Sequence, residues 1–151
     1  MKNFKQKEVP ATSEMAAEPK RVKEYMTDKN KLITFHPDTH ILDVAQSLLQ
    51  NRITGAPVLN QMGDVVGLID DKDCLRIVVE TMYHNHPVLD KTASHYMSNI
   101  MKSVNQETDI NEAANIFLTT PYKRLLVIDD DGKLRGQISR RDILKALFDM
   151  D

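Results

Sequence analysis

The stretch GQISRRD at residues 136–142 decides the fold of this chain, because GLIDDKD at residues 67–73 is an earlier copy of it. The two stretches lie 69 residues apart, and the same shift aligns residues 38–79 with 107–148 without a gap. Ten positions are identical in the two copies, and the apolar pattern agrees as well. A repeat has to be identified before single motifs are interpreted. The chain is therefore one structural unit written twice.

Each copy predicts the same order of helices and strands. An amphipathic helix with apolar residues at positions i, i+3, i+4, i+7 and i+8 comes first. Two short apolar runs follow as buried strands, and the glycine-containing turn between them predicts a hairpin. A second helix ends the copy, and a short strand near residues 32–35 completes a β-α-β-β-α unit. The four main elements are predicted at 41–49, 56–60, 65–69 and 74–82 in the first copy, and at 110–118, 125–129, 134–138 and 143–148 in the second.

The segments that flank the copies also repeat. KEYMT at residues 23–27 and SHYMS at 94–98 are related by a shift of 71, and each predicts a short helix leading into its unit. The amino-terminal residues are polar and without apolar periodicity, which predicts a flexible tail. Pro87 should stop the helix before it. The expected division is a tail at 1–18, a first unit at 19–83, a linker at 84–91 and a second unit at 92–151.

The repeated pattern resembles a tandem pair of CBS domains, over roughly residues 20–149. The marks of that family are the apolar-Pro-Val strand, here APVLN at 56–60, and the G-h-h-S/T-x-x-D segment at the end of the hairpin, where h is apolar. GQISRRD matches this segment except at Gln137, whereas Asp70 replaces the hydroxyl residue in the first copy. The resemblance implies an α+β fold with two units packed sheet to sheet about a pseudo-twofold axis, two clefts, and dimers of such pairs.

In the CBS family the clefts bind adenosine-containing ligands, and no catalytic machinery comes with the module. The resemblance assigns Ser139 and Asp142 to one site, with the serine on phosphate and the acid on ribose hydroxyls, and Asp73 to the other site. The implied ligand is a regulatory adenine nucleotide such as AMP, ADP or ATP, or another adenosine-containing molecule, in the cleft between the two units, and no further cofactor is implied. The expected partners are this small molecule, a second copy of the chain in a homodimer, and a separate effector protein.

The segment SRRD also has a structural interpretation. Ser139 followed by Asp142 is close to a capping box, and Asp70 is a good N-cap in the first copy. Capping does not explain Arg140 and Arg141, because cations are unfavourable at a helix start. A bound phosphate would explain them, since arginine matches phosphate oxygens and helix starts attract anions.

Two more cations are expected near this motif, because Lys123 and Arg124 precede the strand that should start beside the end of the hairpin. The first copy has Thr54 and Gly55 at those positions and Asp71 and Lys72 in place of the two arginines. A phosphate about 4 Å from the carboxylate of Asp70 would be repelled by roughly 4 kcal/mol at an effective dielectric constant of 20. The first cleft is therefore expected to be empty, or to hold an uncharged adenosine-type ligand through Asp73.

Composition limits the other classes of function. The net charge of −2 with 28% charged residues does not indicate general nucleic-acid binding, and no run is long enough for a membrane span. The start lacks the apolar segment of a secretory signal, and the single cysteine, Cys74, suits a reducing compartment, so a cytoplasmic location is expected. His84 and His86 with Cys74 lack the paired spacing of zinc sites, so no metal is expected.

Three hypotheses remain. The first is a regulatory module that binds an adenine nucleotide and changes the relative orientation of its units. The second is a structural dimerisation module in which SRRD only caps a helix. The third, an enzyme, has little support, because no nucleophile with a neighbouring base, paired acids or phosphate-binding loop is present.

Overall fold

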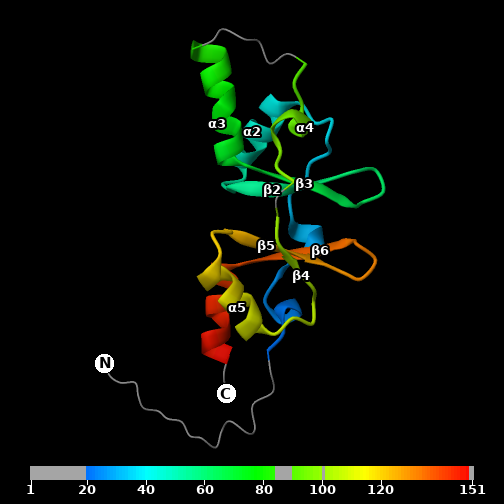
Figure 1. Cartoon of the computed structure of the whole chain (residues 1–151), viewed down its shortest axis with the longest axis vertical. Helices are drawn as coiled ribbons and strands as arrows, with labels where there is room; N and C mark the ends of the chain where they lie inside the picture. The colour runs from blue at the N-terminus through cyan, green and yellow to red at the C-terminus, as the bar shows by residue number, and fades with distance from the viewer. Residues whose placement is uncertain (1–19, 84–89, 100, 150–151) are drawn as a thin grey trace, which may run out of the picture.

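The computed structural model describes residues 20–83, 90–99 and 101–149, and it consists of two similar units whose β-sheets face each other (Figure 1). Helices cover the outer side of each sheet, so the order of layers is helices, sheet, sheet, helices. This arrangement confirms the predicted α+β class with two units about a pseudo-twofold axis. Within the described residues, the helices are too short or too polar to cross a lipid bilayer.

The first unit contains a two-stranded hairpin covered by helices. In chain order its elements are α2 (Ile41–Gln50), β2 (Gly55–Leu59), β3 (Val65–Asp70) and α3 (Asp71–Val78), followed by the π-helical turn η3 (Val79–Tyr83). The apolar face of α2 packs on the hairpin to form one hydrophobic core. The helix, hairpin and second helix predicted for this copy are all present.

The second unit repeats these elements within a four-stranded sheet. They are β4 (Ser103–Val104), α5 (Ile110–Thr119), β5 (Arg124–Ile128), β6 (Leu134–Ser139), α6 (Arg140–Lys145) and the 3-10 turn η4 (Ala146–Asp149). The strand order is β1-β6-β5-β4, where β1 is the short strand Thr27–Asp28, with β5 and β6 antiparallel and β4 parallel to β5. A separate core fills the space between this sheet and its helices.

The two hairpins agree in detail. Their turns contain Gly63 and Gly132, both with φ of 83°, a conformation that glycine adopts without strain. Each hairpin also has an irregularity of register at the same place, after Val58 in one and after Val127 in the other. The repeat in the sequence is therefore a repeat of backbone geometry down to a single bulge.

The strand predicted near residues 32–35 is shorter than expected. Only Phe35 pairs there, through a parallel bridge to Val58 of β2. Asp28 caps the 3-10 turn η2 (Lys29–Lys31), and Pro37 follows soon after, so little chain is left to extend along β2. The expected strand is reduced to a bridge at the sheet edge.

The leading segments, 22–28 and 93–98, are exchanged between the units. The N–H of Val22 donates a 2.9 Å hydrogen bond to the carbonyl of Thr108, and the N–H of Ala93 donates one of 2.8 Å to the carbonyl of Thr39. Val22 accordingly lies in the core of the second unit, and Ala93 in the core of the first. Each segment leads into one unit of the sequence but packs on the other.

The leading segments differ from the two predicted helices in their secondary structure. The first forms the 3-10 turn η1 (Val22–Glu24) and then β1 (Thr27–Asp28), which pairs with β6. The second forms the short helix α4 (Ala93–Tyr96), after which Ser98 bridges to Leu68 of β3. A helix cannot continue through either segment, because the chain turns there to add to the edge of a sheet.

The exchange explains the glycine that begins each motif. A Cβ atom at Gly67 would lie 2.6 Å from the sulfur of Met97, and one at Gly136 would collide with the carbonyl oxygen of Thr27. Both clashes come from the leading segment that crosses the motif strand. The first position of G-h-h-S/T-x-x-D is thus set by close packing against the leading segment, whose nearest atom is a side-chain sulfur at Gly67 and a backbone oxygen at Gly136.

Two predicted segments fall largely outside the described residues. The tail at 1–18 lies outside them entirely, as do residues 84–89 of the linker predicted at 84–91.

Candidate functional site

The end of the second hairpin forms a complete capping box. The N–H of Asp142 donates to the hydroxyl oxygen of Ser139 at 3.2 Å, and the N–H of Ser139 donates to Oδ2 of Asp142 at 3.0 Å. Asp142 is only 9% exposed, and its Oδ1 is 3.3 Å from the ammonium of Lys145. The structural interpretation of SRRD is therefore confirmed, and it fixes the orientation of the Asp142 carboxylate.

The first hairpin ends in a capping box made of two acids. The N–H of Asp73 donates to Oδ1 of Asp70 at 2.9 Å, and the N–H of Asp70 donates to Oδ2 of Asp73 at 3.0 Å. Burial raises the pKa of Asp73, and the charge of Asp70 raises it further, while the hydrogen bond from the Asp70 backbone opposes this shift. The geometry of this capping box matches that of the second unit, but the first unit has a carboxylate, from Asp70, where the second unit has the hydroxyl of Ser139.

Arg124 crosses from the second unit into the first. It begins β5 and stands opposite Ser139 on β6, which confirms the expectation that this strand starts beside the end of the hairpin. Its Nη2 donates a 2.6 Å hydrogen bond to the hydroxyl of Thr54, and Nη1 lies 2.7 Å from where a Cβ of Gly55 would be. The side chain is only 8% exposed. We call this place, bounded by Thr54, Gly55, Asp70, Arg124 and Ser139, the axial notch.

The charge of Arg124 acts on both units. Burial lowers the pKa of its guanidinium, and the charges of Asp70 and Asp71 oppose that shift. A cation from the second unit therefore faces the acidic motif of the first. Arg124 was expected beside the motif of its own copy, and the structure places its guanidinium between the two motifs.

The other three predicted cations lie around the notch with different orientations. Arg140 turns to its own unit, with Nη2 3.5 Å from the carbonyl oxygen of Tyr122 and its guanidinium 6.0 Å from the ring centre of Phe117. Lys123 and Arg141 are exposed, and no hydrogen bond or ion pair holds them among the described residues. These two side chains are free to meet an anion.

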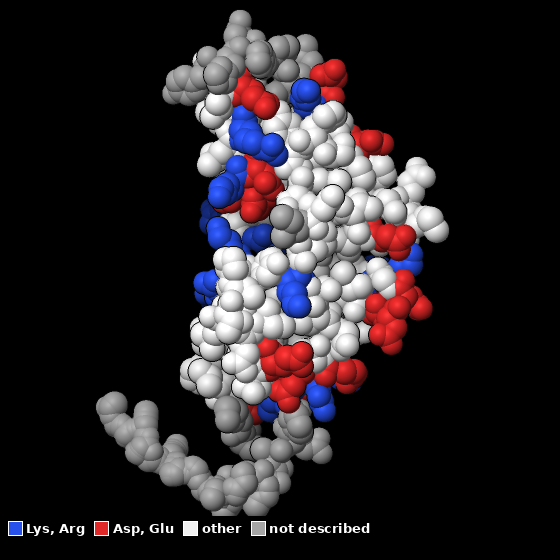
Figure 2. Space-filling view, in the orientation of Figure 1, with Lys and Arg blue, Asp and Glu red and all other residues white. Residues whose placement is uncertain are grey.

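Charged side chains of both signs lie along both long edges of the molecule (Figure 2). Basic side chains gather along one edge at the height where the two units meet, with acidic side chains next to them. The hairpin turns lie at the opposite edge, where Lys133 of the second unit pairs with Asp64 of the first at 2.8 Å. The units are thus joined at both edges, by Arg124 at the motifs and by Lys133 at the turns.

A phosphate at this site would depend on side chains more than on the helix. α6 has six residues, and its capping box already uses the hydroxyl of Ser139 and the N–H of Asp142. The dipole of this short helix therefore contributes little to binding a phosphate. The basic side chains are the remaining source of affinity for an anion.

The roles of Thr54 and Gly55 were not predicted from the sequence. In the sequence they indicate only that the first copy lacks cations, whereas in the structure Thr54 accepts a hydrogen bond from Arg124 and Gly55 leaves space for its guanidinium. A signal was present in the repeat, because an arginine in one copy aligned with a glycine in the other. Near a pseudo-twofold axis, a large side chain of one copy can fill the space that a glycine of the other copy leaves empty.

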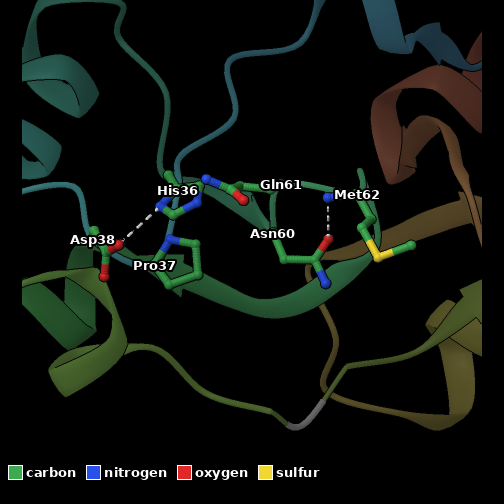
Figure 3. Close-up of a pocket in the computed structure, with 6 residues that line it drawn as sticks. All are labelled: His36, Pro37, Asp38, Asn60, Gln61 and Met62. Atoms are coloured by element: carbon green, nitrogen blue, oxygen red, sulfur yellow. Dashed lines mark hydrogen bonds and ion pairs between the residues drawn. The ribbon is translucent and has the colours of Figure 1, made fainter.

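Two open depressions of the described surface lie away from the two motifs. One of about 480 Å³ is lined by His36, Pro37, Asp38, Asn60, Gln61 and Met62 (Figure 3). There Nδ1 of His36 accepts a 3.1 Å hydrogen bond from the N–H of Asp38. The other, of about 440 Å³, lies beside Tyr25 and Phe148. Neither contains a residue of the predicted site.

Metal ligands do not gather in the described part of the chain, where no group of three or more His, Cys, Asp or Glu side chains is arranged to hold an ion. His84 and His86 of the rejected zinc interpretation lie outside the described residues. Burial raises the pKa of the Cys74 thiol to about 11, so this thiol is protonated at neutral pH.

The fold defines a module of two paired repeats, and each repeat ends its hairpin in a capping box. CBS domains are matched at residues 22–80 and 93–149. The chain belongs to the CBS domain family.

Curated relatives match most of the length of this chain. The chain is 32% identical to the chloroplastic CBS domain-containing protein CBSX1 of Arabidopsis thaliana over 148 residues, which cover 83% of this chain and 63% of that protein. It is 30% identical to the uncharacterized protein MJ1426 of Methanocaldococcus jannaschii, covering 78% of this chain and 87% of the relative. The chain thus spans less than two thirds of the length of CBSX1.

Solved structures confirm the fold. The crystal structure of the CBS-pair protein CBSX2 from Arabidopsis thaliana has a TM-score of 0.77 and 27% identity, covering 87% of this chain and 96% of that one. A second structure of CBSX2 is a complex with AMP, with a TM-score of 0.73 and 27% identity over 85% of this chain and 96% of that one.

Proposed function

We propose that this chain is a non-enzymatic regulatory module that binds an adenine nucleotide at the axial notch. The observation that carries the proposal is the buried guanidinium of Arg124, which is shared by the two units and adjoins the motif residue Ser139. Charged side chains are rarely buried without a full set of partners. The CBSX2 complex with AMP supports the class of ligand.

Different side chains of the second unit bind the ribose and the phosphate of the nucleotide. The carboxylate of Asp142, held in place by its capping box, binds the ribose hydroxyls. Arg124 contacts the phosphate from within the notch, and the exposed Lys123 and Arg141 approach it from outside. Arg140 has a smaller part, because its guanidinium is turned toward Tyr122 and Phe117.

The first unit binds no phosphate in this proposal. Asp70 and Asp73 place two carboxylates at the end of its hairpin, and the pKa of Asp73 is already raised by burial. Arg124 offsets part of this charge but comes from the other unit. Asp73 would hold only the ribose of an uncharged adenosine-type ligand, so one nucleotide binds per chain.

Sensing follows from the position of the notch between the units. A ligand shifts an equilibrium between two arrangements only when it binds one of them more tightly. A phosphate that contacts Arg124 competes with Thr54 and with the acidic residues of the first unit for the same guanidinium. Binding therefore changes the contact between the units, and a separate effector protein reads that change.

A second copy of the chain completes the module as a homodimer. The helices leave a row of large apolar side chains exposed, and the row occurs in both units at equivalent positions. In the first unit these are Leu49, Leu75, Val78 and Val79, and in the second Leu118, Leu144, Leu147 and Phe148. Helices α3 and α5, which carry part of this row, lie on the same side of the molecule (Figure 1), so the pseudo-twofold axis of the chain relates the two halves of the row. Such a surface is self-complementary, as an isologous dimer requires.

Thermal unfolding with AMP, ADP or ATP at millimolar concentration tests the nucleotide proposal. We expect the melting temperature to rise with at least one of them, because a ligand that binds only the folded state stabilises it. Asp142→Ala should abolish the shift, and its matched control Asp73→Ala, which removes the equivalent acid of the other capping box, should reduce it less. Equal losses would contradict the asymmetry of the units, and no shift with any nucleotide would contradict the function.

The alternative is a structural dimerisation module without a ligand. It is favoured by the capping box of the second unit, in which Ser139 and Asp142 already form hydrogen bonds with each other. It predicts a stable dimer whose melting temperature does not respond to nucleotides.

A further inference from the structure

A buried amide oxygen in the second motif has no partner. Oε1 of Gln137 is shielded from solvent and makes no hydrogen bond within the described residues. Buried polar side-chain atoms in native proteins nearly always have a partner, and an exception calls for a ligand, a water molecule or a functional reason. Gln137 is also the residue at which the motif departs from its apolar pattern.

Gln137 lies on the face of the sheet that contains the candidate site. Ile138 points into the core of the second unit, so the side chains before and after it on β6 point to the opposite face, toward the first unit. These are Gln137 and Ser139. They lie about 7 Å apart along the strand, and their partners in register on β5 are Leu126 and Arg124.

The residue that faces Gln137 across the sheet is apolar and buried. Leu126 beside it is 1% exposed although it points away from the helices of its own unit, so the first unit must cover it. The equivalent residue of Gln137 in the first unit is Leu68, which has no polar group in its side chain. The polar exception therefore occurs only in the unit that also supplies Arg124.

We propose that Gln137 recognises the base of the nucleotide, with its Oε1 accepting a hydrogen bond from the exocyclic amino group of adenine. The proposal rests on the proposed function and adds the residue that sets base specificity. The phosphate lies at Arg124, the ribose at Asp142, and the base between the two sheets at Gln137 and Leu126. Hypoxanthine has a carbonyl oxygen at the position of the amino group, so it presents an acceptor to Oε1, and it can be bound only if the Gln137 amide turns over to donate through Nε2.

Recognition at this position is coupled to the arrangement of the units. Oε1 is covered in the present structure, so a base reaches it only when the two sheets separate locally. A ligand that makes this hydrogen bond thus selects a more open arrangement, which is the differential binding that a sensor requires.

Gln137→Leu tests the proposal, since it copies the residue of the first unit. Calorimetry on the full chain with AMP and with IMP should show tighter binding of AMP to the natural protein. In the variant, AMP should bind about five- to tenfold more weakly, as expected for one net hydrogen bond, while IMP changes less than about twofold. Without ligand, the variant should melt no lower than the natural protein, because it loses an unpaired polar group.

The outcomes separate this inference from the proposed function. If the natural protein binds no nucleotide, the function itself is wrong, and the inference falls with it. If AMP binds but Gln137→Leu weakens AMP and IMP equally, or neither, only the inference is overturned. A lower melting temperature with unchanged nucleotide preference would show that a water molecule meets Oε1 and that Gln137 is purely structural.

Discussion

Nη2 of Arg124 lies 2.6 Å from the hydroxyl oxygen of Thr54, although the two residues are 70 positions apart and belong to different repeats. The contact joins the first residue of β5 to the residue just before β2. Any molecule that draws the guanidinium away also loosens the link between the units. This single hydrogen bond therefore connects the candidate site to the arrangement of the whole module.

A double-mutant cycle measures that link. Thr54→Val and Arg124→Met are made singly and together, and their unfolding in urea should show a coupling free energy of about 1.5 kcal/mol. Each single variant already loses the whole hydrogen bond to the charged group, so the double variant loses less stability than the sum of the two. Thr81→Val is the control, since the hydroxyl of Thr81 bonds to the carbonyl of Ile77 at the far end of the α3 helix. Its coupling with Arg124→Met should be near zero. A coupling equal to the control would mean that the contact does not hold the units together.

Ser139→Asp should separate capping from ligand binding. Aspartate caps a helix as well as serine does, so the free energy of unfolding should stay within about 0.5 kcal/mol of the natural protein, whereas Ser139→Ala should lose about 1 kcal/mol. The new carboxylate copies Asp70 of the first unit and repels phosphate. Nucleotide titration should then show binding lost in the aspartate variant, and retained binding would refute the role given to charge at this position.

The glycines of the two motifs should differ in their tolerance of alanine. At Gly136 the added Cβ meets the backbone oxygen of Thr27, which cannot move without shifting β1, so Gly136→Ala should cost about 2 kcal/mol. At Gly67 the nearest atom belongs to the flexible side chain of Met97, so Gly67→Ala should cost less. Urea unfolding of both variants gives the comparison. A larger loss of stability for Gly67→Ala than for Gly136→Ala would contradict the packing of the two leading segments described above.

Tyr96 should make stability depend on pH in the alkaline range. Burial and its hydrogen bond to Glu80 raise the pKa of Tyr96 to about 12 from an ordinary value of 10.0. The folded state then holds the phenolic proton more tightly than the unfolded state, so stability is complete below pH 10 and falls as the pH rises toward 12. Melting temperatures between pH 9 and 12 should show this decline. Tyr96→Phe should show a shallower one, and an identical slope would exclude this tyrosine as the cause.

Charges introduced into the exposed apolar row should break the dimer. Leu75→Glu together with Leu144→Glu places carboxylates at equivalent positions of both units, each more than half exposed in the single chain. Light scattering after gel filtration should show a dimer for the natural protein and a monomer for this variant. Met62→Glu, at the hairpin turn, is the control and should remain dimeric. A natural protein that is already monomeric would contradict the proposed interface.

The parts of the fold that were predictable from the sequence are those set by local patterns. The spacing of apolar residues located α2 and α5, and Gly63 and Gly132 located the hairpin turns, because both signals act within a few residues of the chain. The capping boxes at Ser139 and Asp70 were readable for the same reason. Their geometry depends on the motif alone.

The contacts between repeats were not predictable in the same way. Nothing near Arg124 in the sequence indicates that its guanidinium reaches Thr54, and nothing near Val22 indicates that it packs in the core of the second unit. Such contacts depend on how two finished units meet. Gln137 was visible as a polar residue at an apolar position, but only the structure shows that its oxygen lacks a partner.

The exchanged leading segments have a consequence for how the molecule forms. Because Val22 completes the core of the second unit, and Ala93 and Tyr96 complete that of the first, each half produced separately would lack part of its interior. The architecture is that of a domain-swapped dimer whose two subunits have become one chain. We expect such a chain to become stable only when both halves are present, and two halves made apart should recover the native state only by finding each other.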